Sequence, residues 1–127
     1  MVAKILIVDD DLFIIALLRD FLTGKHHQVI EAGDGAQAFQ LAEKEMPHLI
    51  ILDIVMPGLY GSTTTQKLQE YWRTTKIPII ILSGFSDELV RPLMKENPNI
   101  RFMRKPVNLK ALDQLITELL PAGGYTP

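Results

Sequence analysis

Polar side chains of a few particular types stand where apolar segments of this 127-residue chain end: Asp9, Asp10, Asp53, Ser83 and Lys105. Asp53 is the least expected of them, because it closes the apolar run 49–52 and Pro57-Gly58 forces a turn soon afterwards. A carboxylate at the end of a buried strand needs a cation or hydrogen-bond donors to stay ionised. The other four side chains are candidates for supplying these partners.

The three aspartates indicate a metal site. If Asp9, Asp10 and Asp53 lie together, they repel one another unless a cation joins them. Oxygen ligands without His or Cys suit a hard divalent ion, and Mg²⁺ is the one expected in the cytosol. Lys105 adds a point charge and Ser83 a hydroxyl donor. This combination suits a phosphoryl group that arrives at Asp53, since aspartate can act as a nucleophile and form an aspartyl phosphate.

These side chains can meet only if the segments before them form one parallel sheet. Apolar runs of strand length alternate with helical periodicity, which predicts five strand–helix units with right-handed crossovers and helices on both faces. The predicted strands are 4–9, 28–32, 48–53, 77–83 and 99–104. Strands one, three and four are the most continuously apolar and should be central, which predicts the order 2-1-3-4-5. Ligands of such a doubly wound α/β domain bind at the carboxyl ends of the strands, between strands one and three.

The predicted helices differ in the strength of their signals. Asp34 and Asn108 should cap the second and last helices, whereas Asp11 is more typical of a helix cap than of a metal ligand. We expect Met46 on the inner face of the second helix. The third helix should run to about residue 73 with Leu68, Tyr71 and Trp72 as its anchors, and Pro92 should make the fourth short, kinked or late-starting.

Length and composition predict one ordinary soluble domain over residues 1–121, followed by a tail or linker stub over 122–127. A net charge of -2 gives no reason to expect a nucleic-acid or membrane partner. The absence of cysteine excludes disulfides and thiol catalysis. The apolar runs are too short for a membrane span and the start lacks a signal-peptide pattern, so we expect a cytoplasmic protein.

The chain resembles the receiver domain of two-component response regulators from Lys4 to about Leu120. The resemblance depends on four motifs in order, each at a predicted strand end: Asp9-Asp10, Leu52-Asp53 followed by Met56-Pro57-Gly58, Ile81-Leu82-Ser83-Gly84, and Lys105-Pro106. It implies a flavodoxin-like (CheY-like) fold and a phosphorylatable signalling switch rather than an enzyme with an external substrate.

The resemblance also implies roles for the acidic residues. Asp53 would receive a phosphoryl group from a phosphohistidine on a sensor histidine kinase or phosphotransfer protein. Asp10, Asp53 and the backbone carbonyl of Val55 would bind Mg²⁺, with Asp9 acting through a metal-bound water.

Further implied roles concern the switch. Ser83 and Lys105 would contact the phosphoryl oxygens, and the Lys105–Pro106 peptide bond would be cis. Phe102 would be the aromatic that turns inward when Ser83 moves, although it also suits simple packing on an edge strand. Ser83-Gly84 could likewise be only a turn. An output domain or a homodimer would use the fourth helix, fifth strand and fifth helix.

Other classes of protein remain as alternatives. An aspartate-nucleophile phosphatase would have a second acid two residues after Asp53, where this chain has Val55. A dinucleotide or flavin binder would need a Gly- or Ser/Thr-rich loop after the first strand, where the aspartates 9–11 would repel a bare phosphate. A degenerate receiver acting as a constitutive interaction module would lack some of the five site residues, all of which are present here.

Overall fold

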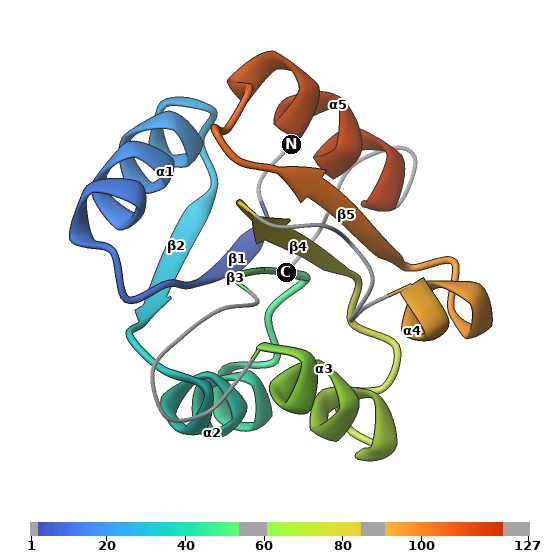
Figure 1. Cartoon of the computed structure of the whole chain (residues 1–127). Coiled ribbons are helices and arrows are strands. Elements are labelled where there is room, and N and C mark those ends of the chain that lie inside the picture. The colour runs from blue at the N-terminus through green and yellow to red at the C-terminus, as the bar shows by residue number, and fades with distance from the viewer. Residues whose placement is uncertain (1–2, 54–60, 85–90, 121–127) are drawn as a thin grey trace.

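The computed structural model describes residues 3–53, 61–84 and 91–120. Within these ranges five strands alternate with five helices (Figure 1). Their order is β1 (Lys4–Val8), α1 (Leu12–Gly24), β2 (Gln28–Ala32), α2 (Gly35–Glu45), β3 (Leu49–Asp53), α3 (Gly61–Glu70), β4 (Ile79–Ser83), α4 (Arg91–Glu96), β5 (Ile100–Arg104) and α5 (Leu109–Leu119). The predicted tail over 122–127 lies outside the described residues.

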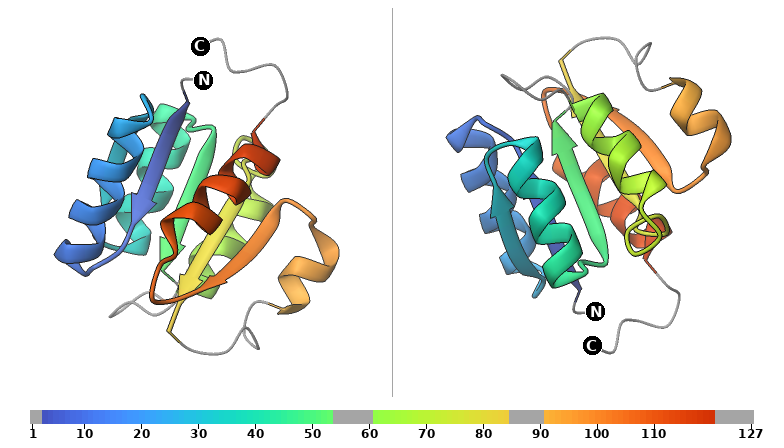
Figure 2. Two further views of the ribbon diagram at one scale, coloured as in Figure 1. Left: turned by 90° about the horizontal axis from the view of Figure 1, so that it is seen from above. Right: turned by 90° about the horizontal axis from the view of Figure 1, so that it is seen from below.

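The strands form one parallel sheet in the order β2-β1-β3-β4-β5, which confirms the predicted topology. Helices α1 and α5 cover one face, and α2 and α3 cover the other (Figures 1 and 2). Alternate residues of the central strands point into two separate cores, one under each helical layer. No helix in the described ranges is long and apolar enough to span a membrane.

Burial follows the apolar pattern of the strands. Every residue of β3 and β4 is buried, as are the last four of β1, whereas β2 and β5 each have one buried residue and four that are partly or fully exposed. A strand with neighbours on both sides and helices on both faces has no contact with water, so only a continuous apolar run is stable there. The prediction that strands two and five form the edges is therefore confirmed.

The predicted helix caps are also confirmed. In each case a side-chain oxygen accepts a hydrogen bond from a backbone N–H in the first turn, which would otherwise have no partner. The three caps are Asp11 to the N–H of Phe13 at 2.9 Å, Asp34 to that of Gln37 at 2.8 Å and Asn108 to that of Ala111 at 3.0 Å.

Two large side chains predicted to be packed are exposed instead. Met46 adopts a left-handed conformation with φ 47° at the end of α2 and is 38% exposed, because Pro47 disfavours a helical conformation in the residue before it. Helix α3 ends at Glu70 rather than near residue 73, and Trp72 is 76% exposed in the turn that follows. Leu68 is buried as predicted, but Thr64 and Thr65 share its core-facing side.

The fourth helix is described over Arg91–Glu96 and contains Pro92. Ser86-Asp87-Glu88 are typical of a capped helix start, but these residues lie outside the described ranges.

Candidate functional site

The carboxyl edge of the sheet brings the predicted site residues together. Asp9 follows β1, Asp53 ends β3, Ser83 ends β4 and Lys105 follows β5. The strands are parallel and in register, with Val8 beside Leu52, and Leu82 beside Asp53. Residues that end neighbouring strands therefore meet at one edge, and β1 and β3 flank the point where the strand order reverses.

Lys105 is ion-paired with two of the aspartates. Its Nζ lies 3.1 Å from Asp9 Oδ2 and 3.4 Å from Asp53 Oδ2. Asp9 and Asp53 are buried, at 2% and 6% exposure, so the pair is largely shielded from water. Burial by itself would lower the pKa of Lys105, but the hydrogen bond and charge of Asp9, with the charge of Asp53, raise it above the ordinary value. Lys105 is therefore protonated at neutral pH.

The three aspartates form a cluster whose geometry suits a metal ion. One carboxylate oxygen each from Asp9, Asp10 and Asp53 lies within 4.8 Å of the other two. All three donors are hard oxygens, and Asp10 is exposed, so water can reach the cluster. Mg²⁺ prefers one or two carboxylates together with several waters, which is what these residues can offer. Val55 lies outside the described residues.

Asp9 uses both carboxylate oxygens for protein contacts. Its Oδ2 accepts from Lys105 Nζ, and its Oδ1 accepts from the backbone N–H of Asp11 at 2.9 Å. Asp11 in turn caps α1. Hydrogen bonds made by the side chains of Asp9 and Asp11 thus hold the loop from β1 to α1 in place.

Ser83 is connected to Lys105 through the backbone. The backbone N–H of Lys105 donates to the carbonyl of Ser83 at 2.8 Å, and the peptide bond between Lys105 and Pro106 is cis. Ser83 itself is fully buried. The hydroxyl and the ammonium therefore come from the paired ends of β4 and β5, which lie on the side of β3 away from β1.

Phe102 lies in β5 beside Ile81 and is partly buried against the core under α2 and α3. Packing against this core is sufficient to explain an aromatic residue at position 102 without a switching role.

An exposed apolar patch next to the site was missed by the sequence analysis. Leu12 and Phe13, at the start of α1, are 80% and 88% exposed, and Leu17 one turn later is 42% exposed. Leu12 and Asp9 line the same small hollow of about 110 Å³. The signal in the sequence was that two large apolar residues, Leu12 and Phe13, begin the helix at positions away from the face that its buried residues form.

The family assignment follows from sequence comparison. The family model described as the response regulator receiver domain matches residues 5–117. The chain therefore belongs to the response regulator receiver domain family, the class of signalling domain found in two-component systems.

Relatives and solved structures agree with this assignment. Protein PilH of Pseudomonas aeruginosa is 35% identical over 118 residues, which cover 93% of this chain and 98% of PilH. Response regulator PleD of Caulobacter vibrioides is 33% identical over 108 residues, which cover 85% of this chain but 24% of PleD. The chemotaxis protein CheY4 of Vibrio cholerae superimposes with a TM-score of 0.85 at 25% identity, covering 94% of this chain and all of CheY4. The chain thus spans almost all of some relatives and a minor part of others.

Proposed function

We propose that this receiver domain accepts a phosphoryl group on Asp53 from a phosphohistidine of a sensor histidine kinase or phosphotransfer protein. The observation that supports this most is the double contact of Lys105 with Asp9 and Asp53. A partly buried ammonium beside the proposed acceptor carboxylate is positioned to neutralise the charge that a phosphoryl group brings.

The transfer itself is a substitution at phosphorus. An oxygen of the Asp53 carboxylate forms the new P–O bond while the P–N bond of the phosphohistidine breaks, and the electron pair returns to the donor imidazole. The Lys105 ammonium, 3.4 Å from Asp53 before the reaction, remains next to the added oxygens. The buried Ser83 hydroxyl, at the neighbouring strand end, donates to one of them. These residues position the group and balance its charge.

Mg²⁺ fits the oxygen donors of the site. When bound, it would neutralise negative charge shared by the carboxylates and the phosphoryl oxygens. We assign Asp10 and Asp53 as direct ligands, together with the Val55 carbonyl implied by the family resemblance. Asp9 is better suited to act through a metal-bound water, because both of its oxygens already accept hydrogen bonds from the protein.

The conformational output would depend on Ser83 and Phe102. When Ser83 moves toward the phosphoryl group, the space near β4 and β5 changes, and Phe102, which packs beside Ile81, can turn inward. The face built from α4, β5 and α5 would then change its affinity for an output domain or a second receiver.

The exposed apolar residues of α1 would contact the phosphodonor protein. Leu12 lines the same hollow as Asp9, and Phe13 and Leu17 continue the exposed apolar surface along α1, so a partner that covers them would bring its phosphohistidine near the site. Exposed aromatic and aliphatic side chains of this kind stabilise a complex when the partner covers them and removes their apolar surface from water. We place this encounter in the cytoplasm.

Phosphorylation with a small donor tests the proposal. The chain incubated with Mg²⁺ and acetyl phosphate should gain one base-labile phosphoryl group, measured by intact mass spectrometry. Asp53→Asn should gain none, whereas Asp20→Asn, which removes an exposed carboxylate from α1, should behave as the parent chain. If the parent chain gained no phosphoryl group, or if Asp53→Asn kept it, the proposed acceptor would be wrong.

A further inference from the structure

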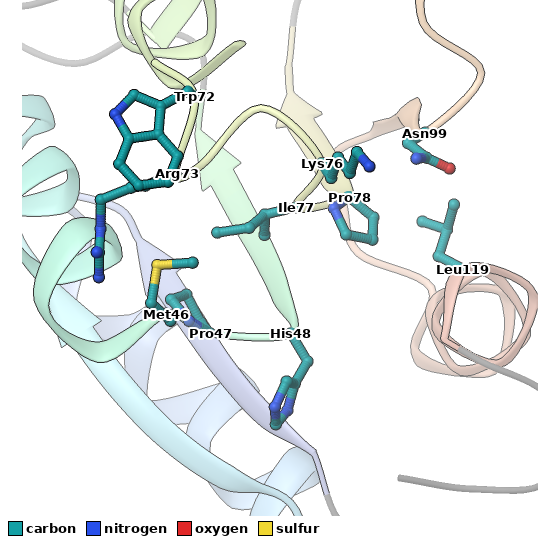
Figure 3. A pocket seen from close by; sticks show the side chains of 10 residues that line it. All are labelled: Met46, Pro47, His48, Trp72, Arg73, Lys76, Ile77, Pro78, Asn99 and Leu119. Atoms are coloured by element: carbon teal, nitrogen blue, oxygen red, sulfur yellow. The ribbon is translucent and has the colours of Figure 1, made fainter. Parts of the chain in front are cut away.

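A groove of about 540 Å³ lies at the opposite edge of the sheet from the aspartates. Figure 3 shows its lining, with Trp72, Arg73 and Met46 toward one end and Asn99 and Leu119 toward the other. Ile77 and Pro78 lie between these ends. The volume is within the range of sites that bind small molecules or side chains of a partner.

The groove is separate from the phosphorylation site. His48, Pro78 and Asn99 stand directly before β3, β4 and β5, whereas Asp53 and Ser83 end β3 and β4. A five-residue strand rises by about 16 Å, so a ligand in the groove cannot touch the aspartates. The proposed phosphoryl transfer does not explain this surface.

An aromatic ridge forms one wall. Trp72 stays 76% exposed, yet it is held by an edge contact to the Tyr71 ring at 6.1 Å, and Tyr71 packs against Phe39 of α2 at 5.6 Å. Met46, 38% exposed, lines the same groove. Exposed Trp and Met side chains are enriched where proteins contact partners, and a ring that is already held in place loses little entropy on binding.

The charges of the groove have one sign. Arg73 and Lys76 are its cations, and no aspartate or glutamate is among the described residues that line it. Arg73 lies 5.7 Å from the Trp72 ring centre and donates to the backbone carbonyl of Glu43 at a long 3.5 Å. No acidic side chain of the described part of the chain pairs with Lys76. His48 accepts the backbone N–H of Lys4 through Nδ1, so it serves the fold rather than a ligand.

We propose that this groove binds a segment of a protein partner that carries a carboxylate next to an apolar or aromatic side chain. The apolar side chain would lie against Trp72, Met46 and Ile77, and the carboxylate would pair with Lys76 and Arg73. Two cations without an acid between them favour an anionic occupant over a neutral or cationic one. This inference does not depend on the phosphorylation of Asp53.

Trp72 is the single tryptophan of the chain, so its fluorescence reports on the groove directly. The full chain would be titrated with the acidic peptide N-acetyl-Glu-Leu-Glu-Phe-amide and with its basic counterpart N-acetyl-Lys-Leu-Lys-Phe-amide. The acidic peptide should give a saturable change in emission that weakens with salt, and it should bind at least about five-fold more tightly than the basic peptide.

Two variants with the same charge change separate the groove from general electrostatics. Lys76→Glu should weaken the acidic peptide by about five-fold or more, whereas Lys110→Glu, on an exposed position of α5 outside the groove, should leave its affinity within about two-fold. Equal binding of the two peptides, equal effects of the two variants, or no saturable binding would overturn the proposal. So would a concentration-dependent dimer in sedimentation that Trp72→Ala abolishes, because the occupant would then be a second copy of the chain.

Discussion

In the proposed phosphoryl transfer, Lys105 would be a competitor of the metal ion as well as a partner of the phosphoryl group. Its ammonium contacts Asp9 at 3.1 Å and Asp53 at 3.4 Å, and both carboxylates belong to the cluster assigned to Mg²⁺. Two cations that share the same anions weaken each other's binding. The Lys105 ammonium should therefore lower the affinity of this site for Mg²⁺.

Replacement of Lys105 should show this competition. We expect Lys105→Gln to bind Mg²⁺ several-fold more tightly and yet to accept a phosphoryl group from acetyl phosphate at least about ten-fold more slowly, since charge compensation at Asp53 is lost. Isothermal titration with Mg²⁺ and intact mass spectrometry provide the two measurements. Lys110→Gln, on the surface of α5, should change neither. A weaker Mg²⁺ affinity in Lys105→Gln would contradict the competition.

At the scale of single elements, the first strand is held by two histidines for which the sequence suggested no role. The backbone N–H of Ala3 donates to His27 Nδ1 at 3.2 Å, and that of Lys4 donates to His48 Nδ1 at 2.8 Å. Burial lowers the pKa of both imidazoles below the ordinary value, and the charge of Lys4 lowers that of His48 further. A protonated ring could no longer accept these hydrogen bonds.

Stability should therefore depend on pH in a defined window. The pKa values of both imidazoles lie below 6.5 in the folded chain and near 6.5 in the unfolded chain. In the pH range between the folded and unfolded values, the unfolded chain therefore binds more protons than the folded chain. The free energy of unfolding should be unaffected by these rings above pH 6.5 and should decrease as the pH falls below it. Urea denaturation at pH 7.5 and 5.5 measures the difference.

Variants identify the rings responsible. His27→Gln and His48→Gln keep an acceptor oxygen without a titrating ring, so each should reduce this pH dependence. His26→Asn should retain it, because His26 is exposed and Asn tolerates its φ of 69°. If the two Gln variants kept the full pH dependence, other groups would be responsible.

The end of α3 depends on a buried threonine. Thr74 is 1% exposed, and its hydroxyl donates to the backbone carbonyl of Leu68 at 2.6 Å. Thr74→Val keeps the shape but leaves that carbonyl without this donor, so it should lower the free energy of unfolding by about 1–2 kcal/mol. Thr75→Val, at a partly exposed neighbouring position, should cost less than about 0.5 kcal/mol in the same urea titrations. Equal losses in the two variants would argue against the hydrogen bond.

At the scale of the whole molecule, the α1 patch should separate protein donors from small donors. Phe13→Ser changes a side chain that is 88% exposed, so the fold and the rate with acetyl phosphate should both be unchanged. Transfer from a phosphorylated histidine phosphotransfer domain should be at least about five-fold slower, because the apolar contact is lost. Stopped-flow or quench measurements with both donors test this, and equal slowing with both would indicate damage to the site instead.

The sequence predicted those parts of the molecule that depend on local pattern and strand burial. The fully apolar runs of β3 and β4 predicted central strands, and the polar residues after them predicted where Asp53 and Ser83 meet. Met46 and Trp72 were predicted wrongly, because helical periodicity does not register that the residue before Pro47 leaves the helical conformation or that α3 stops before residue 71. The histidine acceptors depend on contacts across 24 and 44 residues, which no local pattern contains.

One contact has a consequence for the chain during its synthesis. Lys105 and Asp9 are 96 residues apart, and Lys105 reaches the aspartates only after β5 has paired with β4. A ribosome that has released the chain as far as α3 has already exposed Asp9, Asp10 and Asp53, but not the cation that pairs with them. A nascent chain of this protein would therefore contain the proposed acceptor Asp53 without its ammonium, and the proposed phosphoryl transfer would reach its full rate only once β5 and Lys105 have been translated.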